Sequence, residues 1–272
     1  MQRPKILTYV DEGASDWTAY LMRTIGHQLH AGAYEIRAVM AEDIRSDETL
    51  FDEAKLFVMP GGADLPYCAL LNGEPNARIR RFVEQGGNYL GICAGAYYAC
   101  REIAFHAGTR GAICGPRELA FVDAVAVGSL PELTGGKLYD GTPRTAAAVQ
   151  LRTTERLTDA PISLYTHYHG GCRFDFDGVP PADTQVLAVY TDLDEATPAI
   201  VSANVGQGRA VLSGVHLEIS EMEFAEVLSG HSDRSKHLHV CERLATTSDT
   251  RLAVFRRLLA HAGLELNQVD RA

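Results

Sequence analysis

Short apolar segments of strand length alternate with helical patterns through the first hundred residues of the chain. The expected strands fall just before residue 93 and at residues 5–10, 34–40 and 55–59. Residues 15–30 and 77–84 between them carry a helical period. Ser15 is the expected N-terminal cap of the first helix, and Gly86 follows the second. Because strands alternating with helices form parallel sheets with helices on both faces, this order predicts an α/β fold with functional groups at the strand carboxyl ends.

Cys93 lies where one expected strand meets the next helix. Gly91 and Gly95 flank it at two residues on either side. Without Cβ atoms, these glycines allow strand and helix to approach across a strained turn, as in a nucleophile elbow. The helix beginning near Ala94 would point its free N–H groups at the sulfur and favour an anion there. A cysteine buried only for core packing is the alternative interpretation.

His216 is the expected partner of this nucleophile. It follows the apolar run at residues 209–215 and therefore emerges where other strand ends converge. Glu218 comes two residues later, on the same side of an extended segment. A carboxylate there can hold the imidazole in one tautomer and stabilise the imidazolium, as in a Cys-His-Glu triad. The alternative is a strand-end histidine followed by a solvated glutamate.

The alternation of expected strands and helices becomes less regular after about residue 101. Residues 108–145 are rich in glycine and proline and predict connections with short strands, whereas residues 250–262 predict a final helix. Gly206 and Gly208 predict a hairpin turn. Further strands are expected at residues 146–151, 163–169, 186–190, 199–205 and 209–215. No repeat or low-complexity linker marks a boundary, so we expect a single domain over residues 1–272.

Charge and composition narrow the class of partner. The formal net charge is −10 and no dense lysine and arginine stripe occurs, which disfavours nucleic acid and anionic membranes and favours a small molecule or peptide. The start runs directly into strand-like sequence, no long apolar run follows, and the six cysteines lack a disulfide-type pattern. We therefore expect a cytoplasmic protein with reduced thiols. His237, His239 and Cys241 alternate without standard ligand spacing, so we expect no metal.

Four ordered blocks of sequence resemble a known family. They are MPGGADLPY at residues 59–67, GICAGAYY at 91–98, YHGGCRF at 168–174 and PAIVSANVGQGRAVLSGVH at 198–216. Together with Glu218, they resemble the family named for the biotin-protein ligase N-terminal domain, within the class I glutamine amidotransferase-like superfamily. The resemblance spans roughly residues 5–220, and residues 221–272 form a helical C-terminal extension.

The resemblance implies a flavodoxin-like three-layer sandwich with a mainly parallel sheet and a nucleophile elbow. It also implies Cys93 as nucleophile, His216 as base and Glu218 as the orienting carboxylate. The amides of Ala94 and of Gly61 or Gly62 would form the oxyanion hole.

Two further positions are implied to shape the substrate site. The segment containing Gly170 borders the active cleft in the resembling family. In amidotransferases that use glutamine, a glutamine usually follows the nucleophile by four positions, whereas this sequence has Tyr97 there. A phenol cannot copy the donor and acceptor pair of a primary amide, so glutamine is not expected as the substrate.

The sequence therefore predicts a cysteine-dependent amidase or hydrolase that acts on a small amide or peptide without a cofactor. A peptidase or γ-glutamyl hydrolase would use the same triad, and a non-catalytic binding or regulatory domain is the alternative from another class. Biotin ligation itself is not expected, because the chain lacks a glycine- and arginine-rich adenylate-binding loop. The sequence does not identify a partner protein.

Overall fold

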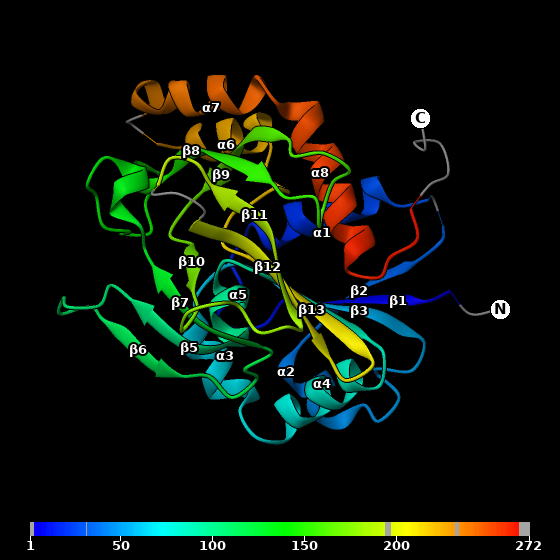
Figure 1. The fold of residues 1–272 in the computed structure, drawn as a ribbon. Helices are drawn as coiled ribbons and strands as arrows, with labels where there is room; N and C mark the ends of the chain where they lie inside the picture. Colours follow the sequence, from blue (N-terminus) through cyan, green and yellow to red (C-terminus); the bar gives the residue numbers. More distant parts are fainter. Residues whose placement is uncertain (1–2, 31, 194–196, 232–233, 267–272) are drawn as a thin grey trace.

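The computed structural model describes residues 3–30, 32–193, 197–231 and 234–266. Its α/β fold confirms the expected class (Figure 1). The larger sheet comprises β1 (Lys5–Tyr9), β2 (Glu35–Val39), β3 (Ala54–Met59), β4 (Asn88–Ile92), β8 (Ala147–Thr153), β9 (Ser163–Tyr168), β11 (Thr184–Tyr190), β12 (Thr197–Val205) and β13 (Gly208–Ser213). The smaller sheet comprises β5 (Cys100–Phe105), β6 (Ile113–Pro116), β7 (Val122–Gly128) and β10 (Cys172–Asp175).

Helices connect and follow these strands. The α-helices are α1 (Thr18–Gln28), α2 (Ala41–Ser46), α3 (Asp64–Leu71), α4 (Glu74–Glu84), α5 (Ala94–Ala99), α6 (Glu221–Leu228), α7 (Leu238–Ala245) and α8 (Ser248–His261). Short 3-10 helices are η1 (Pro131–Thr134), η2 (Pro143–Thr145) and η3 (Arg234–His237).

The larger sheet has the strand order β2-β1-β3-β4-β13-β12-β11-β8-β9. The strands from β2 to β13 in this order are parallel. The remaining pairs, from β13–β12 to β8–β9, are antiparallel. The sheet is therefore mixed rather than mainly parallel, because the hairpin predicted at Gly206 and Gly208 reverses the chain and later strands continue that alternation.

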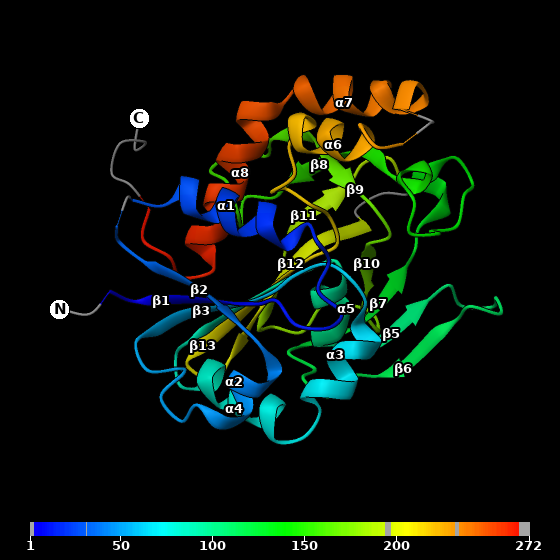
Figure 2. The same ribbon diagram turned by 180° about the vertical axis from the view of Figure 1, so that it is seen from behind.

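Two apolar cores lie on opposite faces of the parallel strands. Ile6 packs in one core and Leu7 in the other, because successive strand residues point to opposite faces. The core containing Leu7 includes side chains of α2, α4 and α5, whereas the core containing Ile6 includes side chains of α1 and α8. Figure 2 shows the same layering from behind, with α1 and α8 on one side of β1 and β3 and α2 and α4 on the other.

Several boundaries differ from the expectation. The first helix begins at Thr18, and Ser15 is not its cap: the Ser15 carbonyl accepts hydrogen bonds from Thr18 N (3.0 Å) and Oγ1 (2.7 Å). Helices α2 and α3 were not predicted, and the short strands expected within residues 108–145 were not predicted to form a second sheet. Their segments are short, and α2 and α3 are each at most eight residues long, which leaves little periodic signal.

Candidate active site

Cys93 occupies the turn between β4 and α5 with φ 50° and ψ −107°. A side chain rarely adopts this left-handed φ, so the surrounding structure must hold the turn. A Cβ on Gly91 would collide with the carbonyl of Gly95, and a Cβ on Gly95 would collide with the carbonyl of Met59. The two glycines therefore allow α5 to approach β3 and β4 closely. Cys93 is 7% exposed.

His216 and Glu218 lie beyond β13, which pairs with β4 in parallel. The two strands end at the same sheet edge, which brings the His216 imidazole and the Cys93 side chain together: atoms of both lie within 4 Å of a Cβ built on Gly61. The Cys93 Sγ itself lies 3.8 Å from the His169 carbonyl oxygen. His216 Nδ1 lies 2.7 Å from Glu218 Oε1, and both side chains are buried. The backbone of His216 is fixed to β9: its amide donates to the His167 carbonyl at 2.9 Å, and its carbonyl accepts from Thr166 Oγ1 at 2.9 Å.

The charge state of His216 follows from these contacts. Burial lowers the pKa of its imidazole, but the Glu218 carboxylate and the hydrogen bonds to Cys93 and Glu218 outweigh burial and raise the pKa to about 10. His216 is therefore an imidazolium at neutral pH. Glu218 Oε1 accepts a hydrogen bond from the Nδ1–H group, which leaves the Nε2–H group to exchange a proton with a reacting group.

Gly61 and Gly62 face the same site from the end of β3. A Cβ built on Gly61 would lie 3.1 Å from His216 Cε1 and 3.5 Å from Cys93 Cβ. Within the residues that the structure describes, the amides of Gly61, Gly62 and Ala94 donate to no other protein group. These three N–H groups are therefore available for an oxygen bound beside the Cys93 sulfur.

A cavity of about 350 Å³ opens over Cys93 and His216. The sequence predicts Gly61, Gly62, Cys93 and His216 at this edge, and the family resemblance implies that the segment containing Gly170 borders the cleft. His167 and His169, which precede Gly170, line the cavity. Local patterns in the sequence do not reveal the remaining lining residues, which lie in connections without a periodic signal: Ala14, Ser15, Asp16, Trp17, Tyr139 and Gly141.

The other two histidines of the cavity are uncharged at neutral pH. Burial lowers the pKa of His167 well below its usual value, and burial lowers the pKa of His169 to about 4. His167 packs against Trp17, with ring centroids 5.1 Å apart, while His169 Nε2 lies 2.9 Å from the Thr142 carbonyl oxygen. The positive charge of the three imidazoles is therefore concentrated on His216, beside the sulfur.

Comparison with known proteins places the chain in a family. The sequence profile of the family described as "Biotin-protein ligase, N terminal" matches residues 4–272. The chain belongs to the biotin-protein ligase N-terminal domain family. The family match extends through residues 221–272, beyond the four blocks noted in the sequence.

Two curated proteins and a solved structure are similar to this chain. An uncharacterized protein of Chlamydia muridarum is 33% identical over 223 residues, 80% of this chain and 82% of that protein. A biotin–protein ligase of Schizosaccharomyces pombe is 30% identical over 236 residues, 85% of this chain but 36% of the ligase. A glutamine amidotransferase crystal structure superposes with a TM-score of 0.51 and 20% identity, over 88% of this chain and 98% of that one. This likeness is one of fold.

The described lining of the cavity over Cys93 does not include Tyr97 or Gly170. Tyr97 is buried, and its hydroxyl lies 3.1 Å from the Gly170 carbonyl oxygen and 2.8 Å from that of Gly171. Gly170 has φ 73° and packs against the Tyr139 ring. In this member of the family, the position expected to hold an amide side chain therefore supports the backbone turn that follows His169.

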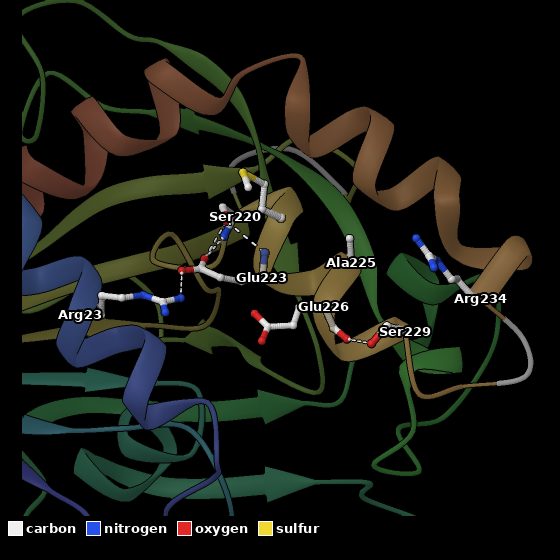
Figure 3. Close-up of a pocket in the computed structure, with 8 residues that line it drawn as sticks. Arg23, Ser220, Glu223, Ala225, Glu226, Ser229 and Arg234 are labelled. Carbon is white, nitrogen blue, oxygen red and sulfur yellow. Dashed lines mark hydrogen bonds and ion pairs between the residues drawn. The ribbon is translucent and has the colours of Figure 1, made fainter.

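A second cavity, of about 600 Å³, lies between α1, α6 and Arg234 (Figure 3). Its charged groups are partly paired: Arg23 Nη2 lies 3.0 Å from Glu223 Oε1, and Glu223 also accepts from Ser220. The described lining of this second cavity contains no cysteine or histidine.

The residues that the structure describes form neither a metal-binding cluster nor a membrane-spanning helix. No group of three or more histidine, cysteine, aspartate or glutamate side chains there could hold a metal ion. No described helix has the length and apolar character needed to cross a bilayer.

Gly61→Ala tests the close approach at the site. The added methyl would lie 3.1 Å from His216 Cε1, so the imidazole must move by a few tenths of an ångström. We expect Cys93 alkylation to slow by about tenfold or more, since small misplacements at a reacting centre are costly. Gly230→Ala adds a methyl where nothing lies within 4 Å and serves as the control. Equal alkylation rates in both variants would show that Gly61 does not position His216.

Proposed function

We propose that this chain is a cysteine-dependent amidase or hydrolase that acts on a small amide or peptide. The observation that carries the proposal is the juxtaposition of Cys93 with His216, whose Nδ1 lies 2.7 Å from Glu218 Oε1, with all three side chains buried beneath an open cavity. A structural cysteine needs none of these partners, whereas a nucleophile needs each of them.

The strand order supports the finer fold assignment. Counting β13 as the fifth strand, the parallel part of the sheet has the order 2-1-3-4-5 of flavodoxin-like folds. We propose that the domain is flavodoxin-like with an antiparallel elaboration, and that the strained turn at Cys93 is a nucleophile elbow.

The proposed reaction has two steps. The Cys93 thiolate attacks the substrate carbonyl carbon, and the imidazolium of His216 gives its Nε2 proton to the leaving amine as the C–N bond breaks. Water then attacks the resulting thioester while His216 accepts one of its protons, and the carboxylic acid leaves as the Cys93 sulfur is released. In each step the amides of Ala94 and of Gly61 or Gly62 would stabilise the oxyanion, and Glu218 would hold the imidazole.

The cavity favours a small substrate with an apolar part. Its volume of about 350 Å³ is near the lower end of ligand pockets, and Trp17 and Tyr139 contribute aromatic walls. We do not extend the ligase activity of the Schizosaccharomyces pombe relative to this chain, since the chain matches 36% of that protein. We retain the cytoplasm as the proposed location and propose no nucleic acid, membrane or cofactor.

We expect weak or no hydrolysis of free glutamine. Tyr97 lies where glutamine-using relatives place an amide, and its hydroxyl is occupied by the carbonyls of Gly170 and Gly171. The substrate amide would therefore lack a specific partner, which disfavours it strongly. Ammonia release from glutamine, measured beside a panel of small amides and dipeptides, checks this. Glutamine turnover faster than that of every other amide would contradict it.

Selective alkylation distinguishes an enzyme from a binding domain. At pH near 7 we expect a limiting dose of iodoacetamide to label Cys93 first. Burial raises the pKa of the thiols of Cys68, Cys100, Cys172 and Cys241, which leaves the exposed Cys114 as the main competitor. Peptide mapping by mass spectrometry measures the order.

The histidine partner provides the control for this labelling. His216→Ala should slow the labelling of Cys93 at least about tenfold while leaving Cys114 unchanged. The exposed His231 provides a matched substitution, His231→Ala, that should leave both rates unchanged. Preferential labelling of Cys114, with Cys93 indifferent to His216, would instead support a non-catalytic binding or regulatory domain.

A further inference from the structure

A third cavity, of about 570 Å³, contrasts in charge with the rest of the molecule. The chain as a whole has 35 acidic and 25 basic residues. Nevertheless the described lining of this cavity contains no aspartate or glutamate. Its ionisable residues are Lys137, Arg144, Lys236, His237, His239 and Arg243. Concentrated positive charge in a concave site is the electrostatic signature of an anion site.

The basic residues come from two sides of the cavity. Lys137 and Arg144 belong to the connection between β7 and β8, residues 129–146, whereas Arg243 belongs to α7. Figure 1 shows this connection in green, near β8 and α7. A ligand in the cavity would therefore contact two segments that are about a hundred residues apart in the sequence.

Three exposed cationic groups of this cavity, on Lys137, Arg144 and Arg243, have no ion-pair partner among the described residues. Lys137 Nζ lies 3.4 Å from the carbonyl oxygen of Arg144, and the Arg243 guanidinium lies 5.9 Å from the centre of the Tyr165 ring. Asp140 is within electrostatic reach of Arg144, but its Oδ1 accepts hydrogen bonds from Thr142 N (2.9 Å) and Oγ1 (2.7 Å). The three charges are thus available to a ligand.

We propose that this basic cavity binds a small polyanion that carries phosphate groups. Arginine forms bidentate, charge-assisted hydrogen bonds with phosphate oxygens, and lysine adds a mobile point charge. The cavity volume is in the range of small-molecule sites. Because the site is concave and small, it suits a di- or triphosphate group better than it suits the flat surface of a macromolecule.

Binding here would also act on the Cys93 cavity, because the two cavities share one segment. Residues 129–146 contribute Tyr139 and Gly141 to the Cys93 cavity, and Lys137 and Arg144 to the basic cavity. The same segment is tied to the catalytic side through His169 Nε2 and the Thr142 carbonyl, 2.9 Å apart. A polyanion that bridges Arg144 and Arg243 would fasten this segment over the Cys93 cavity.

Calorimetric titration with sodium tripolyphosphate at low salt tests the site. We expect saturable binding with about one ligand per chain, weakened by added salt. Lys137→Gln combined with Arg144→Gln should weaken binding roughly tenfold or more. Arg243→Gln, on α7 at the other side of the cavity, should also weaken binding. Arg110→Gln, at an exposed arginine in another loop, changes the net charge as Arg243→Gln does and should leave the affinity unchanged. Citrate, a carboxylate polyanion, should bind less tightly than tripolyphosphate.

Hydrogen exchange locates the ligand independently of affinity. Tripolyphosphate should protect amides in residues 129–146 of the wild-type chain and not in the double variant. Absence of binding at millimolar tripolyphosphate, or equal loss in Arg110→Gln and Arg243→Gln, would overturn the proposal. Because neither measurement uses catalysis, this result is separable from any failure of the proposed hydrolase activity.

Discussion

Replacing Cys93 with alanine should reduce amide hydrolysis by at least about a thousandfold, since no covalent intermediate can form without the sulfur. The substitution removes one atom from a side chain that is 7% exposed, so the fold should persist. Turnover of the best amide or dipeptide in the panel measures the loss, and thermal unfolding checks the fold. Cys68→Ala, at a partly buried thiol of α3, is the matched control and should retain wild-type turnover.

The outcome separates covalent catalysis from other routes. If the variant keeps more than about a tenth of wild-type turnover, the sulfur is not the nucleophile. Binding of the same substrate to the variant, measured by calorimetry, shows whether the cavity is still intact. Lost turnover with retained binding is the expected pair of results.

Glu218→Gln should lower the rate constant of the chemical step by roughly a thousandfold to ten-thousandfold. The amide cannot stabilise the His216 imidazolium as the carboxylate does, and it can orient the ring in the wrong tautomer. Because Glu218 is the principal group that raises the pKa of His216, the variant should have a lower His216 pKa than the wild type. Histidine proton titration by NMR measures the pKa, and pre-steady-state kinetics measures the rate.

The pH dependence of stability gives a second readout. The pKa of His216 is raised by folding from 6.5 to about 10, so the imidazolium contributes stability that is fully present below about pH 6.5 and is lost as the pH rises through about 10. The wild type should therefore have a larger free energy of unfolding than Glu218→Gln at low pH, by at most roughly 5 kcal/mol. This difference should shrink as the pH rises from about 6.5 through about 10. Glu226→Gln, an exposed glutamate of α6, is the control. A difference independent of pH would contradict the pairing of His216 with Glu218.

The candidate triad could be located from sequence because it depends on adjacent parallel strands. Cys93 follows β4 and His216 follows β13, and Ser213 pairs with Ile92 in parallel register. The carboxyl ends of neighbouring parallel strands meet at one edge, so two strand-end residues 123 positions apart come together. Glu218 requires only its spacing from His216. The glycines around Cys93 could be recognised because a strand and a helix that meet this closely leave no room for a Cβ atom.

The antiparallel half of the sheet was harder to predict. The sequence predicted the position of each of these strands with small errors at the ends. The pattern of a strand does not, however, indicate which other strand it pairs with. The pairing of β11 with both β12 and β8 is decided by the surface that each strand buries. The same holds for the smaller sheet, in which β5 pairs in antiparallel with β6 on one side and in parallel with β7 on the other.

The sequence by itself determined the α/β class, the strained cysteine turn and the spacing of the histidine and glutamate, because each depends on local sterics and strand periodicity. Only the tertiary structure decided that Trp17 and Tyr139 enclose the Cys93 cavity, that Tyr97 supports the turn at Gly170 and that Arg144 and Arg243 face one basic cavity. These positions lie in connections or on remote elements. Their contacts depend on how the whole chain packs, for which a local pattern carries no signal.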